Sequence, residues 1–374
     1  MIICGDVSVP NEECGRRLLE SMIESNIFAN QTVVMNLEGV LLADNPSETF
    51  WKVYNDKSIL NLKNICSDLI FGLANNHIYD YPEQIRTMLS MLNDTHIPYF
   101  GLAEADGSFK PLEFEADGVL YAIFGHCWEV YTRTNKNNRT SDKVVDCTYR
   151  NFYKSVIEYM NQHSSIKVIC FFHWNFDMEK YTFPAYKKLA HDLIDYGVEA
   201  VIGNHSHCQQ EVEIYNGKVI AYGLGNFYMP DGYFFNGTLK YPVESHNMCV
   251  VEISKSGVCI HEFETDTQSG SALSLIKTYN LSRDIGAKSS KEKYDEEAYE
   301  SFFKRNRVKK KITPIFYTYD NSLENILKTD YCILKIAAIR TIKQMIDRNL
   351  RNTNHLRRGR KKNECIVDDN YSKK

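Results

Sequence analysis

The sequence predicts an α/β protein in which two β-sheets face each other and helices cover their outer sides. Short apolar runs rich in β-branched residues alternate with segments of helical period as far as about residue 203. Residues 209–264 then change to short strand patterns that are joined by Asn-Gly or Ser-Gly turns. With 374 residues, of which 43% are hydrophobic and 25% charged, the chain is long enough to bury a large core.

The strands and helices follow from the spacing of apolar residues along the chain. Six strands are predicted in the first half, at residues 2–7, 32–37, 68–74, 119–124, 167–172 and 200–202. Helices between them are predicted at residues 11–26, 80–94, 148–162 and 184–197. Four further strands are predicted at residues 211–215, 218–222, 248–253 and 258–263.

The C-terminal part differs from the rest of the chain. The strand pattern weakens beyond Gln268, so we divide the chain into a first domain, residues 1–268, and an extension, residues 269–374. The extension is predicted to contain a charged linker and a helix from about Ser322 to Leu350. One face of this helix is apolar and is expected to pack on the first domain: Leu323, Leu327, Leu334, Ala338, Ile342 and Met345. The basic run Arg357–Lys362 is expected to be a solvated tail.

Charge is divided unevenly between these parts. The formal net charge of the whole chain is −4, but residues 301–374 carry 19 Lys or Arg against 7 Asp or Glu, a balance of +12. Residues 1–300 therefore have a balance of −16. An acidic body with a basic tail indicates two pieces with different partners, the tail being suited to an anionic surface or polymer. We expect no specific binding of nucleic acid.

Cysteine usage and hydropathy bear on the compartment. Eleven cysteines are scattered singly, with no Cys-x-x-Cys pair, as is typical of a reducing compartment. The N-terminal residues enter a strand pattern directly and show no signal-peptide pattern. Apolar stretches are interrupted by charges such as Lys335 and fall short of the roughly 20 residues that a membrane helix needs. We therefore expect a cytoplasmic protein without a transmembrane segment.

Polar side chains follow five of the predicted strands, at the point where each strand ends. Ligands of α/β sheets bind at the carboxyl ends of the strands. Each of these residues alone is explained as well by a turn, a helix cap or a structural hydrogen bond. Together they form a nitrogen and oxygen ligand set suited to Mn, Zn or Fe. The candidate ligands are Asp6, Glu38, Asn76, His173, His205 and His207.

Six motifs, in order, resemble those of the CapA family, which belongs to the calcineurin-like metallophosphatase superfamily and is associated with capsule and poly-γ-glutamate synthesis. The motifs are Gly5-Asp6, Asn36–Gly39, Ala74–Tyr81, His173-Trp174, Ile202–His207 and Leu224–Phe227. The resemblance spans about residues 1–255. It implies a four-layer α/β/β/α sandwich of metallophosphatase type, with two divalent metal ions at the strand ends and the helical, basic extension outside it.

The resemblance also implies how the two metals are shared. Asp6 and His207 would hold one ion, and Glu38 would bridge it to the other. The second ion would take the remaining three ligands: Asn76, His173 and His205.

Two catalytic residues are implied outside the ligand set. His77 matches the superfamily residue that acts near the leaving group. The second is an acid in the segment after His173-Trp174: counting back from Pro184 favours Glu179, whereas counting forward from His173 favours Asp177. We prefer Glu179.

Three further residues after the strand at 119–124 either line the cleft or pack in the core: His126, Trp128 and Glu129.

The chain departs from the superfamily pattern at Ser8, where a His is usual. The departure leaves the first metal with fewer ligands and keeps two functions open. The first is a metal-dependent, phosphoesterase-like hydrolase of capsule or polysaccharide biosynthesis that acts on an anionic substrate or polymer precursor. The second is a non-catalytic accessory or binding protein of a polyglutamate or capsule-polymer synthesis system, with capsule-synthesis proteins as partners. The otherwise complete ligand set favours the hydrolase.

Overall fold

The structure is a computed structural model of the chain. It describes residues 1–44, 46, 52–104, 108–134, 142–266, 272–281, 295–309 and 313–367, with side chains described as far as Ile346.

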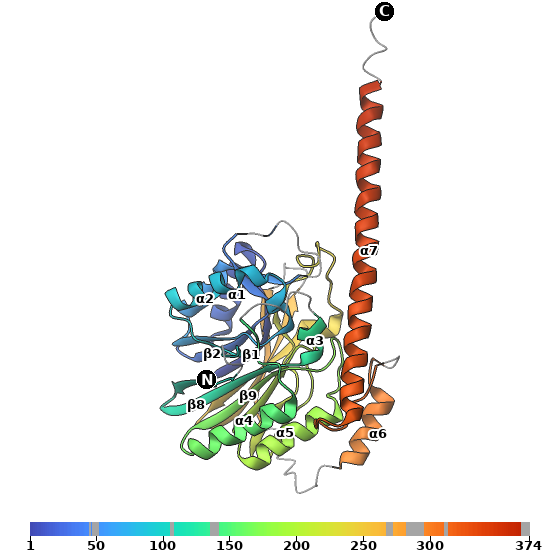
Figure 1. Cartoon of the computed structure of the whole chain (residues 1–374). Coiled ribbons are helices and arrows are strands. Elements are labelled where there is room, and N and C mark those ends of the chain that lie inside the picture. The colour runs from blue at the N-terminus through green and yellow to red at the C-terminus, as the bar shows by residue number, and fades with distance from the viewer. Residues whose placement is uncertain are drawn as a thin grey trace, which may run out of the picture.

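Two sheets lie face to face, and helices cover their outer sides (Figure 1). The first sheet contains β1 (Ile2–Val7), β2 (Thr32–Leu37), β5 (Asp68–Gly72), β6 (Tyr99–Phe100), β13 (Asn226–Tyr228), β14 (Asn247–Ser254), β15 (Gly257–Asp266) and β16 (Ala272–Asn280). Its order is β16-β15-β14-β1-β2-β5-β6, with β13 paired in parallel to the end of β1. A separate ribbon consists of β3 (Val40–Leu42) and β4 (Tyr54–Asp56).

The second sheet has the order β11-β12-β10-β9-β8-β7. Its strands are β7 (Leu112–Ala116), β8 (Val119–Cys127), β9 (Lys167–His173), β10 (Ala200–Asn204), β11 (Val212–Tyr215) and β12 (Lys218–Ala221). The helices are α1 (Glu12–Ser25), α2 (Ile85–Asp94), α3 (Glu129–Thr134), α4 (Tyr149–Gln162), α5 (Pro184–Tyr196), α6 (Glu296–Asn306) and α7 (Leu323–Val367). Strands β8, β9, β10 and β12 run parallel, so their carboxyl ends lie at one edge of the sheet.

Three clusters of buried apolar side chains fill the spaces between the four layers. In β1, Ile2 belongs to the cluster beneath α1 and α2, whereas Ile3 belongs to the cluster between the sheets. In β9, Ile169 lies between the sheets and Cys170 lies beneath α4 and α5. Successive side chains of a strand point to opposite faces, so apolar runs of this kind fit strands that are covered on both sides. The layers confirm the predicted four-layer α/β/β/α sandwich.

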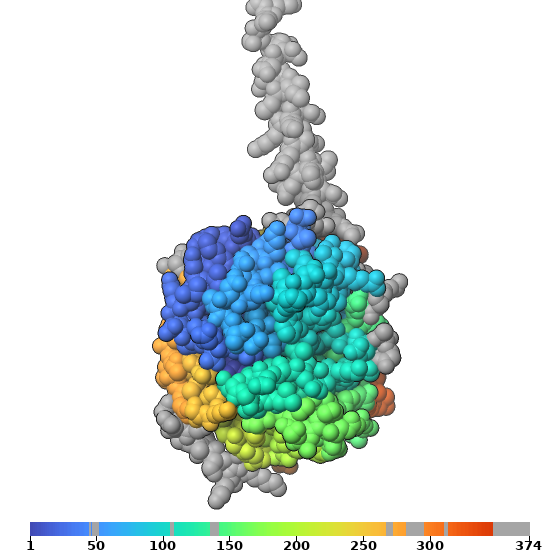
Figure 2. Space-filling view, turned by 90° about the vertical axis from the view of Figure 1, so that its left-hand side faces the viewer, coloured from blue at the N-terminus to red at the C-terminus, as the bar shows by residue number. Residues whose placement is uncertain are grey.

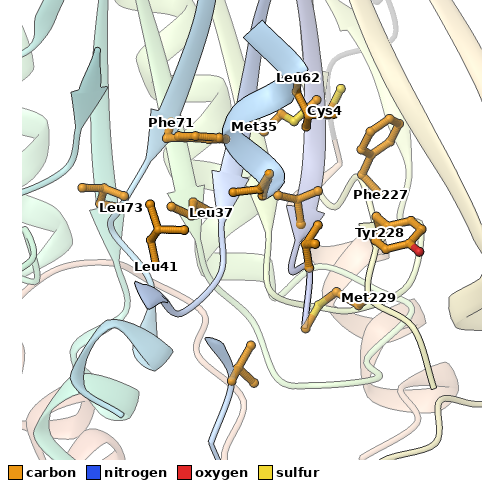
Figure 3. Close-up of a cluster of buried hydrophobic side chains, with 14 of the residues drawn as sticks. Cys4, Met35, Leu37, Leu41, Leu62, Phe71, Leu73, Phe227, Tyr228 and Met229 are labelled. Atoms are coloured by element: carbon orange, nitrogen blue, oxygen red, sulfur yellow. The ribbon is translucent and has the colours of Figure 1, made fainter. Parts of the chain in front are cut away.

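Figure 2 shows one face of the body, and Figure 3 shows part of one buried cluster. In the space-filling view, the N-terminal residues in blue and cyan and those of α4 and α5 in green are parts of one continuous body (Figure 2). The close-up shows side chains of the first sheet, such as Met35 and Phe71, among those of the cluster beneath α1 and α2 (Figure 3).

The segment predicted as a helix at residues 80–94 begins differently. The Asn75 side chain accepts a hydrogen bond from the backbone N–H of His77 and caps a 3-10 helix over Asn76–Tyr79. Pro82 starts a second 3-10 helix, and α2 begins only at Ile85. Pro is accommodated in the first turn of a helix, so Pro82 can begin the helical segment that leads into α2, while Asn76 and His77 remain in the connection between β5 and Pro82.

The C-terminal extension packs on the second sheet. Phe303 of α6, Phe316 and Cys332 of α7 belong to the cluster beneath α4 and α5. Strand β16 pairs with β15, so the first sheet continues beyond residue 268. None of the described helices is both long and apolar enough to cross a membrane.

The expectation for the apolar face of α7 is wrong. Leu323, Leu334 and Met345 are exposed, whereas Asn325, Thr329 and Cys332 on the opposite face are buried against the body. The predicted stripe therefore faces away from the first domain. The helix also continues to Val367, so the basic run Arg357–Lys362 lies within a helical backbone.

Candidate metal centre

The structure brings all six predicted ligands together where strands of the two sheets end. Asp6 lies near the end of β1, Glu38 follows β2, and Asn76 follows β5. His173 ends β9, and the loop after β10 supplies His205 and His207. All six side chains are buried. They form a polar group between two sheets that are otherwise filled with apolar residues.

Short distances join these side chains across the two sheets. His173 Nε2 lies 2.7 Å from Asn76 Oδ1, and His173 Nδ1 lies 3.7 Å from Asp6 Oδ1. His207 Nδ1 lies 3.8 Å from Asp6 Oδ2, and its Nε2 lies 3.8 Å from Glu38 Oε1. The first and second sheets thus both contribute to a single site.

Glu38, His205 and His207 have the geometry of a metal site. One potential ligand atom from each lies within 4.8 Å of the others. Both carboxylate oxygens of Glu38 and Nδ1 of His205 are buried and make no hydrogen bond, while His205 Nε2 lies 2.9 Å from Asp177 Oδ1. Buried polar atoms without hydrogen bonds are rare and costly, so three such atoms side by side indicate a site for a ligand. Carboxylate and imidazole donors suit Zn, Mn or Fe, and the residues therefore fit the divalent cations that the sequence predicts.

The electrostatics of the site favour a cation for the same reason. Burial raises the pKa of Glu38 well above its usual value, and the negative charge of Asp6 raises it further. Burial also raises the pKa of Asp6, although His207 and the His205 backbone N–H oppose this effect. For His173, burial and then the neighbouring imidazoles lower the pKa well below the usual value. A cation would offset the cost of burying the two carboxylate charges, and the imidazoles of His173 and His207, whose pKa burial lowers, would face it as neutral donors.

The backbone of the ligand loop is held in an uncommon conformation. His205 has a φ of 80° and His207 a φ of 51°. These values lie in the left-handed region of backbone conformation, which residues other than glycine rarely adopt. The backbone N–H of His205 donates to Asp6 Oδ2 over 2.9 Å, which fixes the loop on the end of β1. Strained residues of this kind persist where surrounding contacts enforce them, and they concentrate at functional sites.

A glycine lets the first strand approach its neighbour. A Cβ atom on Gly5 would lie 2.0 Å from the backbone oxygen of Gly225, which accepts a hydrogen bond from the Asp6 N–H. Only glycine allows this approach, so Gly5 sets the position of the adjacent Asp6 carboxylate.

His77 is oriented by an acidic partner. Its Nδ1 lies 2.6 Å from Asp80 Oδ2, and its Nε2 lies 3.7 Å from Glu38 Oε1. Asp80 is itself held by the backbone N–H of Val53, which donates to Oδ2 over 2.8 Å. A carboxylate that accepts from Nδ1–H leaves Nε2 as the nitrogen that faces the site. The Asp80 role was not predicted, although Asp80 follows His77 by three residues in one of the quoted motifs.

Two asparagines that the sequence left unassigned hold the ligands in place. Asn36 Nδ2 donates to Asp6 Oδ1 over 2.7 Å and lies 3.3 Å from His173 Nδ1. Asn226 Oδ1 lies 2.7 Å from His207 Nδ1. Such partners orient metal-binding side chains. Both asparagines stand in quoted motifs, and a polar amide inside or beside a buried strand was the available signal.

The two candidate acids lie in different surroundings. Asp177 Oδ1 lies 2.9 Å from His205 Nε2, and its side chain is exposed. Glu179 is buried, and its two carboxylate oxygens accept hydrogen bonds from the backbone N–H groups of Val308 and Lys309. Glu179 is thus engaged with the C-terminal extension, while Asp177, the alternative obtained by counting forward from His173, lies beside a predicted ligand. The geometry gives no support to a catalytic role for Glu179.

The remaining candidates serve the core. Ser8 Oγ donates to the backbone oxygen of Tyr54 over 2.8 Å, so its hydroxyl is engaged with β4. His126 Nε2 lies 2.6 Å from the backbone oxygen of Cys147, and burial lowers the pKa of His126 to about 4. Trp128 packs edge-on against Phe316. His126 and Trp128 therefore follow the structural alternative that the sequence left open.

The comparisons with known proteins agree with the motifs. A family model described as "Bacterial capsule synthesis protein PGA_cap" matches residues 18–231, more than half of the chain. The PGA biosynthesis protein CapA of Bacillus subtilis (strain 168) is 26% identical over 182 residues, which are 48% of this chain and 47% of that protein. The capsule biosynthesis protein CapA of Bacillus anthracis is 22% identical over 169 residues, 44% of this chain and 41% of that protein. The chain thus spans about half the length of the curated relatives that it matches.

Among solved structures, a putative 5'-nucleotidase from Staphylococcus aureus in complex with α-ketoglutarate aligns with a TM-score of 0.42 and 12% identity, over 81% of this chain and 59% of that chain. This similarity is too low to support an argument about function. The family match rests on the sequence, and the matched residues include five of the six motifs, all but Gly5-Asp6. The chain belongs to the family of bacterial capsule synthesis proteins described as PGA_cap.

Proposed function

We propose that this chain is a dinuclear metal-dependent hydrolase of the phosphoesterase type that acts in capsule or polyglutamate biosynthesis. One observation carries the proposal: both carboxylate oxygens of Glu38 and Nδ1 of His205 are buried without hydrogen bonds, beside His207. A protein that used these residues only for packing would leave three polar atoms unsatisfied. The chain belongs to a family named for capsule synthesis, and this membership supports the proposal that the substrate is an anionic compound or polymer precursor.

The six ligands would divide between two cations, and each cation would take ligands from both sheets. Asp6 and His207 would hold one ion, and Glu38 would contribute to both. When bound, such cations supply Lewis-acid stabilisation of an anionic ester and an activated water. The second ion would take a larger set in addition to Glu38: Asn76, His173 and His205.

The chain's own proton transfer would fall to His77. Asp80 accepts from Nδ1 and so presents Nε2 toward the site beside Glu38. With Nδ1–H donating to Asp80, His77 would need a second proton on Nε2, and in this imidazolium form it would donate the Nε2 proton to the leaving oxygen, a contribution that typically amounts to about 10²–10⁴ in rate. Asp177, exposed beside His205, would orient the ring of that ligand.

A non-catalytic accessory role is the second candidate, and Ser8 favours it. The Ser8 hydroxyl donates to the Tyr54 backbone oxygen, so the position of the usual His supplies no ligand. The first cation would then have only Asp6, His207 and Glu38. A weakly held first ion would leave a pocket that binds an anionic polymer without cleaving it.

Turnover measured on metal-loaded protein distinguishes the two functions. The chain is stripped with a chelator, reloaded with Mn, Zn or Fe, and assayed on an aryl phosphate, a phosphodiester and a γ-glutamyl amide. We expect metal-dependent hydrolysis of a phosphoester. The substitution His205→Ala should abolish this hydrolysis, and the control His163→Ala, outside the site, should retain it. Metal binding without turnover on any of these substrates would replace the enzyme by the accessory protein.

A further inference from the structure

The long helix α7 carries two different faces. On one face Asn325, Thr329 and Cys332 are buried against the body. The opposite face carries a row of exposed apolar side chains, here called the outer stripe: Leu323, Leu327, Leu334, Ile342 and Met345. Leu323, Leu334 and Met345 follow one another at intervals of 11 residues. Such a repeat has 3.67 residues per turn and so stays on one side of a nearly straight helix.

The outer stripe is a concentrated patch. Leu323 and Leu334 are each 71% exposed, and Met345 is 59% exposed. Of the 17 large hydrophobic residues that are exposed in the described part of the chain, nine lie on α7. Single exposed apolar residues need no explanation, but a contiguous patch marks an interaction surface.

The charge of the same helix identifies the occupant. Between Arg340 and Lys362 the sequence has nine Lys or Arg and one acidic residue, Asp347. Two copies paired in parallel through the outer stripe would bring these like charges together, whereas an anionic surface attracts them. Figure 1 shows α7 running along the body and then continuing well beyond it, which carries the basic part away from the acidic residues 1–300.

We propose that α7 docks the protein on an anionic lipid bilayer. The outer stripe enters the boundary between headgroups and acyl chains, with the helix lying in the plane of the surface, and the basic residues that follow contact anionic headgroups. A helix of this kind binds through its buried apolar area together with electrostatic attraction. The face that packs on the body is left unchanged, so docking is compatible with the fold as it stands. The proposal does not depend on the hydrolase.

Co-sedimentation of the full chain with vesicles tests the docking surface. We expect binding to vesicles of phosphatidylcholine mixed with phosphatidylglycerol and little binding to phosphatidylcholine alone. The double variant Leu334→Glu, Met345→Glu should lower the affinity at least about tenfold, since it removes two inserting side chains. The matched control is Val243→Glu, Ile276→Glu, which changes two residues that are 75% and 59% exposed outside α7 and should leave binding unchanged. Arg357→Ala should weaken binding by about fivefold.

Melting temperatures confirm that the variants are folded, and Leu327→Gln, Ile342→Gln replaces the first pair if that pair unfolds. Equal binding to both kinds of vesicle, or binding that both stripe variants leave unchanged, would overturn the proposal. So would a dimer in analytical ultracentrifugation that the stripe variants dissociate, combined with no vesicle binding, because the occupant would then be a second copy.

Discussion

At the scale of single residues, the ligands of the candidate metal centre depend on side chains that bind no metal. Asn36 holds both Asp6 and His173, and Asp80 holds His77. The sequence indicated the candidate ligands because an acid or imidazole at a strand end stands out against apolar neighbours. It gave no basis for assigning Asn36 or Asp80, since an amide or acid near a turn has the same pattern whether it caps, turns or supports a ligand.

The role of His77 is tested by His77→Asn. The substitution removes the proton donor and leaves the six proposed ligands in place, so we expect unchanged metal content and a loss of about 10²–10⁴ in turnover. His96→Asn, at an exposed position with a φ of 55° that suits Asn, is the matched control. Loss of metal in His77→Asn would make His77 a ligand, and unchanged turnover would remove it from the mechanism.

Asp177 and Glu179 are separated by paired amide substitutions. Asp177→Asn should lower turnover and leave the melting temperature nearly unchanged, because its side chain is exposed. Glu179→Gln should instead lower the free energy of unfolding by about 1–3 kcal/mol, since a charged acceptor of two backbone hydrogen bonds is lost. Turnover assays and urea unfolding of both variants check this division. The reverse pattern would restore the catalytic assignment of Glu179.

At the scale of elements, the strands were the most predictable part of the fold. β1 and β2 have the bounds that their apolar runs predict, because a strand covered on both faces reads as an uninterrupted apolar segment. Short or partly exposed elements were missed, among them α3, α6 and β16. The outer stripe of α7 was recognised as an apolar face, but periodicity alone does not tell which partner covers a face.

A partly buried ionic group on the outside of the second sheet gives an element-scale prediction. Glu213 on β11 lies 2.7 Å from His191 Nε2 of α5 and accepts a hydrogen bond from the Tyr222 hydroxyl. Burial alone would raise the pKa of Glu213, but the His191 hydrogen bond and the Lys187 charge outweigh it and lower the pKa from 4.5 to about 2.

Because the folded pKa is the lower one, the stabilisation is fully present above pH 4.5 and is lost as the pH falls toward 2. It amounts to at most about 3 kcal/mol. Urea unfolding of wild type and Glu213→Gln should therefore differ most at pH 6 and least near pH 3. Glu264→Gln, at an exposed position on β15, is the control. A difference that stays constant across this range would contradict the assigned pKa.

At the scale of the whole molecule, the extension is partly core and partly surface. Phe303, Phe316 and Cys332 complete the cluster beneath α4 and α5, and Glu179 ties residues 308 and 309 to the loop that follows β9. The predicted boundary at residue 268 reflected a change of composition, and packing of this kind leaves no mark on composition. The contrast between the acidic body and the basic end of α7 could be read from charge counts alone.

Two truncations test this division. A chain that ends at Arg351 should keep its metal content and melting temperature and bind anionic vesicles more weakly. A chain that ends at Asn321 also loses Cys332, Ile333 and Ile336 from the cluster beneath α4 and α5. It should lose about 2–5 kcal/mol of unfolding free energy, given the apolar area that it uncovers. Precipitation or metal loss in the longer chain would place the basic end in the core.

The metal content of the purified chain is the most direct test of the proposed dinuclear metal centre. Protein expressed with Mn, Zn or Fe supplementation and purified without chelator is measured by elemental analysis, together with His205→Ala. We expect one tightly held ion per chain, at Glu38, Asn76, His173 and His205, and a second ion that dialysis removes. His205→Ala should lose the tight ion. Wild-type protein that contains no divalent metal under any of these conditions would show that the proposed metal centre does not exist.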